Sequence, residues 1–158
     1  MNSLKPTILF LDDDAYSFMD KKEWLAEAGF DVIACTRIDQ ANEHLQERLD
    51  DIECIVADLN MLANWLPKEI QLETNGASMA GWVWLYRQVY PRKLIPTIVY
   101  SEFAKQLKKR LETLGASTEE AKIAAQMSGK IIFFSKRDTV RDGFGAVIDA
   151  IRELIKEG

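Results

Sequence analysis

The chain has 158 residues, of which 47% are hydrophobic and 28% are charged, and its formal net charge is −5 at pH 7. This length suits one domain of ordinary size, which buries enough surface to fold without a metal ion or a disulfide. The acidic charge, and the absence of an apolar stretch near the roughly 20 residues that cross a bilayer, predict a cytoplasmic protein with no nucleic-acid partner and no membrane partner.

Short apolar runs alternate with longer helical patterns along the chain. The runs are almost uninterrupted, which is typical of strands covered on both faces of a parallel sheet. In chain order the pattern predicts a strand at 7–11, a helix at 16–28, a strand at 31–35, a helix at 36–49, a strand at 53–57, a helix at 79–89, a strand at 96–100, helices at 103–114 and 118–126, a strand at 130–134 and a helix at 139–156.

Local signals mark some of the helix ends. Gly29 is placed to end the first helix in a left-handed conformation. The segment Ser117-Thr-Glu-Glu120 has the spacing of a capping box at the start of the helix at 118–126. Trp82 and Trp84 are two residues apart and do not share a helix face, so we expect one of them to be exposed or covered by the long segment before the helix.

Strand and helix alternate five times, which predicts an α/β domain. We expect a five-stranded parallel sheet, doubly wound in the flavodoxin-like order 2-1-3-4-5 with helices on both faces, and a single domain over residues 1–158. The two cysteines, Cys35 and Cys54, are interpreted as reduced core thiols. One isolated histidine, His44, offers little for metal binding or for nucleophilic catalysis.

Polar side chains follow four of the five predicted strands. Asp12 and Asp13 follow the first strand, Asp58 the third, Ser101 the fourth and Lys136 the fifth. Because ligands of an open parallel α/β sheet bind outside the carboxyl ends of its strands, we expect these residues to meet at one edge. Carboxylates gathered in this way repel one another unless a cation is bound, and Mg²⁺ prefers such oxygen ligands.

These residue types indicate chemistry on a phosphoryl group. Asp58 beside a bound metal is usable as a nucleophile towards phosphorus. The metal, the Ser101 hydroxyl and the Lys136 ammonium would bind the oxygens of the attached group.

The ordered set resembles the receiver domain of two-component response regulators, including the single-domain chemotaxis regulator. The matching segments are ILFLDDDA at the acidic pair, CIVADLNM at Asp58, TIVYS at Ser101 and IIFFSK at Lys136. The resemblance spans residues 7–155. It implies that Asp58 is the phospho-acceptor and that Asp13, Asp58 and the main-chain carbonyl of Asn60 hold Mg²⁺, with Asp12 helping through water. It also implies a conformational switch at Ser101 and Phe133.

The chain departs from that family at several positions. Leu62 stands where the family usually has proline, and the glycine that opens the family's third helix appears only at Gly81. Glu102 replaces a small residue at the entrance to the phosphorylation site, or begins the next helix. Arg137 replaces a proline that follows a typically cis peptide bond, and a non-proline residue favours the trans form by about 2.5–4 kcal/mol.

Two segments are longer than in the family, and we interpret them as insertions at about 59–80 and within about 102–129. The first is either a tolerated surface insertion or a lid or docking surface with Trp65 as its anchor. The second lengthens the region that forms the family's signalling face.

Three functions are open at this point. The first is a stand-alone receiver, a switch rather than a metabolic enzyme, that accepts a phosphoryl group on Asp58 from a histidine kinase or phosphotransfer protein and signals to a downstream protein. The second is a divergent receiver that binds a protein partner without phosphorylation. The third is a phosphatase of the haloacid-dehalogenase type with Asp12 as its nucleophile, for which Leu11-Asp12-Asp13-Asp14 supplies the D-x-D pattern.

Overall fold

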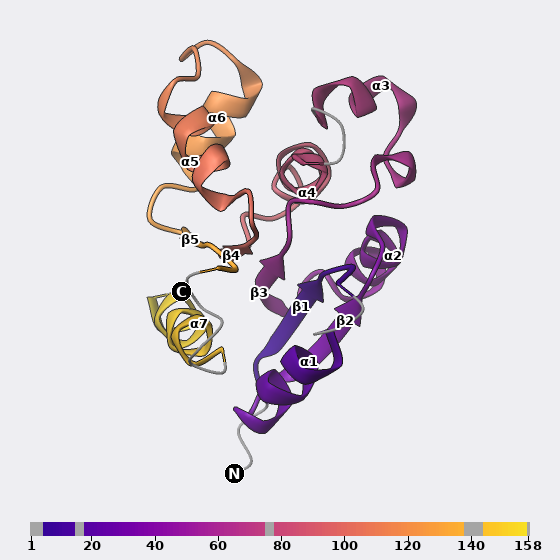
Figure 1. Cartoon of the computed structure of the whole chain (residues 1–158), viewed down its shortest axis with the longest axis vertical. Helices are drawn as coiled ribbons and strands as arrows, with labels where there is room; N and C mark the ends of the chain where they lie inside the picture. Colours follow the sequence, from indigo (N-terminus) through magenta and orange to yellow (C-terminus); the bar gives the residue numbers. More distant parts are fainter. Residues whose placement is uncertain (1–4, 15–17, 75–77, 138–143, 158) are drawn as a thin grey trace.

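A five-stranded parallel sheet with the order β2-β1-β3-β4-β5 forms the centre of the molecule (Figure 1). The computed structural model describes residues 5–14, 18–74, 78–137 and 144–157. Each strand limit lies within one residue of the predicted one, so the predicted sheet and its order are confirmed. The strands are β1 (Thr7–Leu11), β2 (Asp31–Cys35), β3 (Ile52–Ala57), β4 (Thr97–Tyr100) and β5 (Ile131–Phe134).

Helices cover both faces of the sheet, as predicted (Figure 1). Side chains alternate between the faces along each strand. In β1, Ile8 and Phe10 belong to one apolar cluster, and Leu9 and Leu11 belong to the other. The first cluster includes buried residues of α1 (Phe18–Glu27) and α7 (Gly145–Glu157). The second includes residues of α2 (Ile38–Arg48), α4 (Ala80–Trp84), η3 (Leu85–Val89) and α5 (Ala104–Glu112), with Ile123 of α6 (Glu119–Gln126) packed against it.

Of the two helix ends predicted from local signals, one is confirmed and the other is shifted. Gly29 ends α1 with a φ of +101°, in the left-handed region that glycine adopts without strain, so that prediction is confirmed. The predicted capping box at 117–120 is wrong by one residue. Thr118 is the N-cap of α6, and its Oγ1 accepts a hydrogen bond of 3.1 Å from the amide of Ala121. Glu120 is thereby free to turn inward instead of reaching back to the cap.

The predicted helix at 79–89 changes its winding halfway. It is α-helical over Ala80–Trp84 and a π-helix over Leu85–Val89. Trp82 and Trp84 are both fully buried, so neither is exposed, and η2 of the preceding segment packs against α4. Helices on either side satisfy their indole groups: Trp82 Nε1 donates to Glu120 of α6 at 2.9 Å, and Trp84 Nε1 donates to Asn42 of α2 at 2.7 Å.

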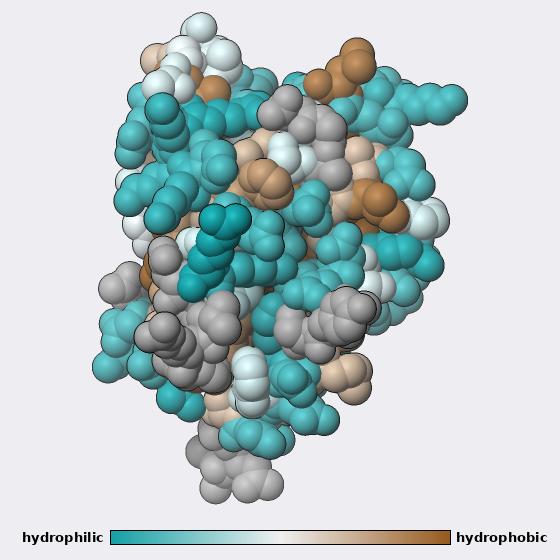
Figure 2. All heavy atoms as spheres, viewed as in Figure 1, coloured by the Kyte–Doolittle hydropathy of each residue, from teal (hydrophilic) through white to brown (hydrophobic). Residues whose placement is uncertain are grey.

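The long segment between β3 and α4 is partly anchored to the core. It contains the short helices η1 (Ala63–Trp65), α3 (Lys68–Gln71) and η2 (Leu72–Thr74). Leu66 and Thr74 are buried, and Glu73 forms an ion pair of 2.8 Å with Arg87 of η3. Its surface also carries exposed Leu62, Trp65 and Leu72, and Figure 2 shows brown atoms over the α3 region at the upper right. Residues 75–77 of the segment lie outside the described residues.

The two cysteines lie in the core, as predicted. Cys35 and Cys54 are buried free thiols, and burial raises the pKa of each to about 12, which keeps both protonated and unreactive. Within the described part of the chain, no helix is long and apolar enough to cross a bilayer. The first turn of the predicted helix at 139–156 lies outside the described residues, and α7 begins at Gly145.

Candidate functional site

The carboxyl ends of β1 and β3 place two aspartates side by side. The backbone ladder of the sheet continues one residue past each strand: the amide of Asp12 donates to Cys35 O at 3.0 Å, and the amide of Asp58 donates to Leu11 O at 2.9 Å. These bonds fix both residues at the edge where parallel strands present their carboxyl ends. Asp12 and Asp58 are almost fully buried, with 1% and 5% of their surfaces exposed.

Three carboxylates converge at this edge. Asp12, Asp13 and Asp58 each offer an oxygen, and these oxygens lie within 4.8 Å of one another. Asp13 is the exposed member of the group. Partial burial, followed by the charges of Asp58 and Asp12, raises the pKa of Asp13. The carboxylates therefore repel one another, and a hard divalent cation with oxygen ligands would relieve that repulsion.

Lys136 reaches the same cluster from the loop after β5. Its Nζ lies 2.7 Å from Asp58 Oδ2 and 3.2 Å from Asp12 Oδ2. Burial opposes the charge of this ammonium, but the nearby carboxylates of Asp58 and Asp12 outweigh burial and raise the pKa of Lys136. Lys136 is therefore a fixed cation at neutral pH. Its bridge to Asp58 and Asp12 links the ends of β1, β3 and β5.

The turns after β1 and β3 orient the two buried carboxylates. Asp12 Oδ1 accepts a hydrogen bond of 2.9 Å from the amide of Asp14, and Asp58 Oδ1 accepts one of 3.1 Å from the amide of Asn60. A side-chain oxygen bonded to the amide two residues further on forms a small local ring that holds the side chain in one rotamer. Both oxygens of Asp58 are thus engaged, Oδ1 by backbone and Oδ2 by Lys136.

Gly81, in the first turn of α4, packs closely against the backbone of Asp58 and Leu59. Its amide donates to Leu59 O at 3.0 Å. A Cβ atom at this position would lie 2.1 Å from the main-chain oxygen of Asp58, closer than any real contact. The start of α4 therefore approaches the backbone of Asp58 as closely as only a glycine permits.

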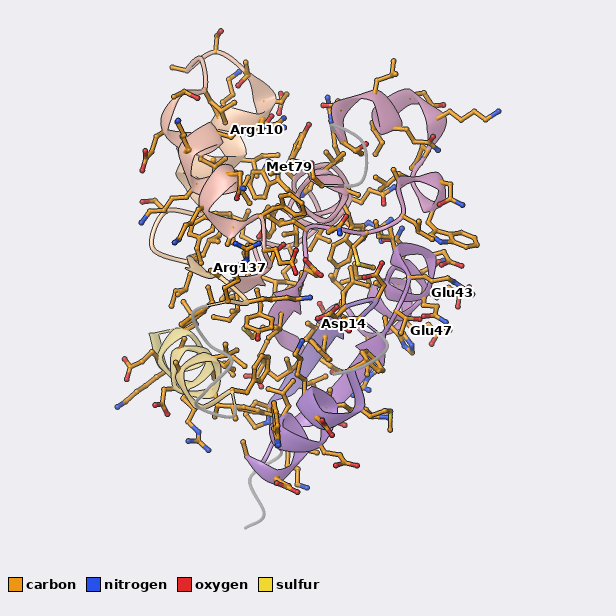
Figure 3. The ribbon with its side chains drawn as sticks, viewed as in Figure 1. Asp14, Glu43, Glu47, Met79, Arg110 and Arg137 are labelled. Carbon is orange, nitrogen blue, oxygen red and sulfur yellow. The ribbon has the colours of Figure 1, made fainter. Side chains whose placement is uncertain are left out.

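A small cavity opens onto the cluster. It has a volume of about 280 Å³ and is lined by Asp13, Asp14, Asp58, Asn60, Glu102 and Lys136. Figure 3 places Asp14 beside the ends of the central strands and Arg137 beside β4 and β5. The oxygen-rich lining of the cavity fits a partly hydrated divalent cation, and Asp13, Asp58 and Asn60, the ligands that the resemblance implies, are all among the lining residues. Glu102 lines this cavity, at the entrance to the site, and α5 begins only at Ala104.

Ser101 and Phe133 do not line this cavity. Ser101 is fully buried, and its Oγ accepts a hydrogen bond of 3.1 Å from the amide of Phe103. It reaches the site through the backbone, because the amide of Lys136 donates to Ser101 O at 3.4 Å. Phe133 is half-buried in β5 and lines a separate groove of about 400 Å³ between α5 and α6. The described residues contain no cis peptide bond, so the bond between Lys136 and Arg137 is trans, as predicted.

Sequence analysis missed two residues of the site. Lys21 of α1 is buried, and its Nζ lies 3.4 Å from Asp12 Oδ2. Tyr100, the last residue of β4, presents its ring to both lysines: the ring centroid lies 4.9 Å from the Nζ of Lys21 and 5.8 Å from that of Lys136. A signal for Lys21 was present in the sequence. It falls three residues after Phe18 and four before Leu25, on the stripe that α1 turns towards the sheet.

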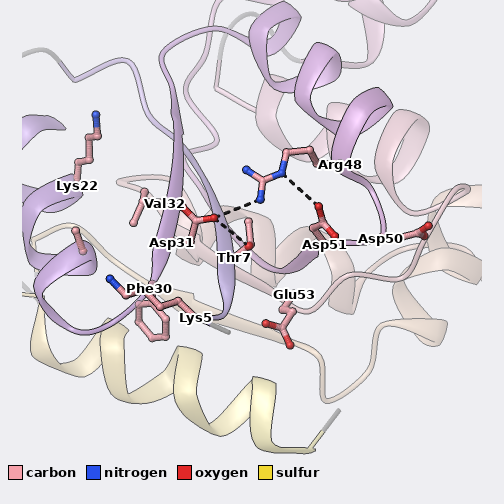
Figure 4. A pocket seen from close by; sticks show the side chains of 11 residues that line it. Lys5, Thr7, Lys22, Phe30, Asp31, Val32, Arg48, Asp50, Asp51 and Glu53 are labelled. Carbon is pink, nitrogen blue, oxygen red and sulfur yellow. Dashed lines mark hydrogen bonds and ion pairs between the residues drawn. The ribbon is translucent and has the colours of Figure 1, made fainter. Parts of the chain in front are cut away.

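A larger cavity lies at the opposite, amino-terminal edge of the sheet (Figure 4). Its volume is about 870 Å³, and charged residues of both signs line it. Arg48 pairs with Asp31 at 3.3 Å and with Asp51 at 3.4 Å, so part of this charge is already neutralised. No residue of the acidic cluster lines this cavity, so it is separate from the site at the strand ends.

Three solved structures with a similar fold are receiver domains. A CheY-like receiver domain from Methanospirillum hungatei JF-1 is 18% identical with a TM-score of 0.51, and the match covers 99% of this chain and 100% of that one. A response-regulator receiver domain from Clostridium thermocellum is 16% identical with a TM-score of 0.54, covering 96% and 94%. The response-regulator domain of Thermotoga maritima CheB is 17% identical with a TM-score of 0.57, covering 96% and 97%.

The solved structures establish the fold of this chain. The chain has the fold of a response-regulator receiver domain over nearly its whole length. No family model matches the chain, and no curated protein matches it. The roles of individual residues therefore rest on the geometry of this site.

Proposed function

We propose that this chain is a phosphorylatable receiver, in which Asp58 accepts a phosphoryl group in a reaction that depends on Mg²⁺. One observation carries the proposal: Asp58 belongs to the acidic cluster, lines the cavity of about 280 Å³ and lies 2.7 Å from the ammonium of Lys136. The donor would be a histidine kinase or a phosphotransfer protein, as the receiver fold suggests. The chain would then act as a signalling switch that contacts a downstream protein.

The geometry favours Asp58 over Asp12 as the nucleophile. Both carboxylates are held by an amide and by ammonium groups, but Asp12 does not line the cavity, and its Oδ2 contacts two ammonium groups, those of Lys21 and Lys136. Asp58 faces the cavity, where a phosphoryl donor can approach it. This difference argues against a phosphatase of the haloacid-dehalogenase type with Asp12 as its nucleophile.

The residues would share the work of one transfer. A carboxylate oxygen of Asp58 attacks phosphorus, a new P–O bond forms, and the bond between phosphorus and the leaving group of the donor breaks. Lys136 would move from Asp58 Oδ2 to an oxygen of the transferred group and neutralise part of its charge. Mg²⁺, held by Asp13, Asp58 and the carbonyl of Asn60 with Asp12 behind them, would neutralise the remainder when bound.

The signal would leave the site along β4 and β5. The Ser101 hydroxyl would turn to donate to an oxygen of the phosphoryl group and would give up the hydrogen bond that it now accepts from the amide of Phe103. Because Phe103 is the N-cap of α5, this exchange would shift the start of that helix. Phe133 lines the groove beside α5, so we propose that it responds to the same shift.

Labelling with a small acyl-phosphate donor tests this function. We expect incorporation of one phosphoryl group per chain in the presence of Mg²⁺ and none after chelation. Asp58→Asn should abolish it, while Asp14→Asn, at an acid that also lines the cavity, should retain it. Labelling that survives in Asp58→Asn would refute the proposal.

A second candidate is a receiver that binds its partner without phosphorylation. The side chain of Glu102 favours it, because an additional carboxylate on the cavity repels an incoming phosphoryl group. Glu102→Ala distinguishes the two functions. If the wild-type chain and Glu102→Ala both remain unlabelled while partner binding persists, the binding module is the correct function.

A further inference from the structure

A second lysine, buried in α1, contacts the acidic cluster beside Lys136. Lys21 has 5% of its surface exposed, whereas lysine is among the residues that are least often buried. Its Nζ lies 3.4 Å from Asp12 Oδ2 and 4.0 Å from Asp14 Oδ2. A lysine placed on the inner stripe of α1 is expensive to desolvate, so its contacts with these acids must stabilise it there.

Lys21 and Lys136 share one carboxylate oxygen of Asp12. Both Nζ atoms contact Asp12 Oδ2, at 3.4 Å and 3.2 Å. The ring of buried Tyr100 lies within cation–π distance of both, which fixes the two cations relative to each other. Two ammonium groups therefore stand against the three clustered carboxylates, with Asp14 and Glu102 as further acids on the cavity, so part of the negative charge that would attract a metal ion is already neutralised.

We propose that Lys21 is a resident cation that weakens Mg²⁺ binding at this site by occupying Asp12. The inference rests on the proposed function, because it concerns the metal site of the same reaction. Lys21 acts through Asp12 and is a positioning residue. It keeps the metal-free cluster stable and makes Mg²⁺ compete with a built-in charge, so the chain binds the ion only at higher concentrations than the three carboxylates alone would require.

The direction of the effect follows from electrostatics. Removal of one positive charge beside a divalent-ion site strengthens the attraction of that ion, and at short range even a well-screened interaction with a divalent ion amounts to about a tenfold change in affinity. Lys21→Met keeps an unbranched apolar chain of similar length and deletes only the charge. Misfolding would weaken Mg²⁺ binding, so a gain of affinity separates this role from a merely structural one.

Calorimetric titration of the metal-free chain with Mg²⁺ tests the inference. The variants are Lys21→Met, Lys21→Arg and the matched control Lys22→Met, which removes the same charge from an exposed neighbour on the same helix. We expect Lys21→Met to lower the Kd for Mg²⁺ about tenfold, and Lys21→Arg and Lys22→Met to change it less than about twofold. Thermal unfolding of each variant checks that it is folded.

The outcomes separate this inference from the proposed function. Equal or weaker Mg²⁺ binding by folded Lys21→Met overturns the inference, and so does an absence of binding in every variant. Acyl-phosphate labelling on the same samples reports the function independently. A tenfold gain in Mg²⁺ affinity with no labelling at Asp58 would support the role of Lys21 and refute phosphorylation. Labelling at Asp58 together with an unchanged Mg²⁺ affinity of Lys21→Met would support phosphorylation and refute the role of Lys21.

Discussion

Replacement of Gly81 by alanine tests the close contact between α4 and the proposed phospho-acceptor. The new Cβ would lie 2.1 Å from Asp58 O, about 1.3 Å short of the 3.4 Å at which ordinary contact begins, and 3.0 Å from the Cα of Leu59. All of these obstructing atoms belong to the backbone, which cannot rotate away as a side chain can. Either α4 or the segment after β3 must therefore move.

The expected cost combines two opposing effects. Alanine is favoured over glycine inside a helix by about 1 kcal/mol. Overpacking a close contact costs about 1–3 kcal/mol, and the rigidity of the obstructing backbone favours the upper end of that range. We therefore expect Gly81→Ala to lower the free energy of unfolding by about 2 kcal/mol. Because the displaced backbone belongs to Asp58, acyl-phosphate labelling of folded Gly81→Ala should also be slower than that of the wild type.

Urea denaturation followed by tryptophan fluorescence measures this change. Gly115→Ala is the matched control, because a Cβ at that position meets no atom within 4 Å, and its stability should equal or slightly exceed that of the wild type. If Gly81→Ala is as stable as Gly115→Ala and is labelled at the wild-type rate, the close approach of α4 to the acidic edge does not exist.

Three further substitutions, with Leu72→Ala as a control, test the site and its supports. Burial and the neighbouring carboxylates raise the pKa of Asp13, so its ionised form opposes folding, and the free energy of unfolding should rise as the pH falls through that pKa. Asp13→Asn should raise the Tm of the metal-free chain at pH 7, flatten this pH dependence and abolish calorimetric Mg²⁺ binding. Glu120→Ala leaves the guanidinium of Arg110 and a buried indole without their acceptor and should cost about 3 kcal/mol in urea denaturation. Leu66→Ala should cost about 2–4 kcal/mol, whereas Leu72→Ala, at a side chain that is 93% exposed, should change stability by less than about 0.5 kcal/mol.

The sheet and most of the acidic edge could be predicted because they depend on simple periodicities. The apolar runs predict the strands, and the ends of those strands predict where Asp12, Asp58 and Lys136 lie. Parallel strands bring their carboxyl ends to one edge whatever the loops between them do. That is why residues as distant in sequence as Asp12 and Lys136 could be assigned to one site, where their side chains lie 3.2 Å apart.

The misses arise where a tertiary contact overrides a local pattern. Glu120 has the spacing of a capping residue, but a buried indole and a guanidinium attract it inward, and Thr118 becomes the cap. Lys21 lies on the inner stripe of α1, which is a local signal of burial, but only its partner Asp12, nine positions earlier and outside that helix, explains how a charged residue is stabilised there. Trp82 is buried by α6, which follows β4, so no local signal could reveal it.

Identification of the labelled aspartate tests the central claim most directly. Borohydride reduction converts an aspartyl phosphate into homoserine, so peptide mass mapping after acyl-phosphate treatment in Mg²⁺ reports which residue carried the group. We predict homoserine at Asp58 alone, and none when Mg²⁺ is chelated. Homoserine at Asp12 or Asp13, or unmodified aspartate at all three positions under conditions where the chain is folded and Mg²⁺ is bound, would contradict the account.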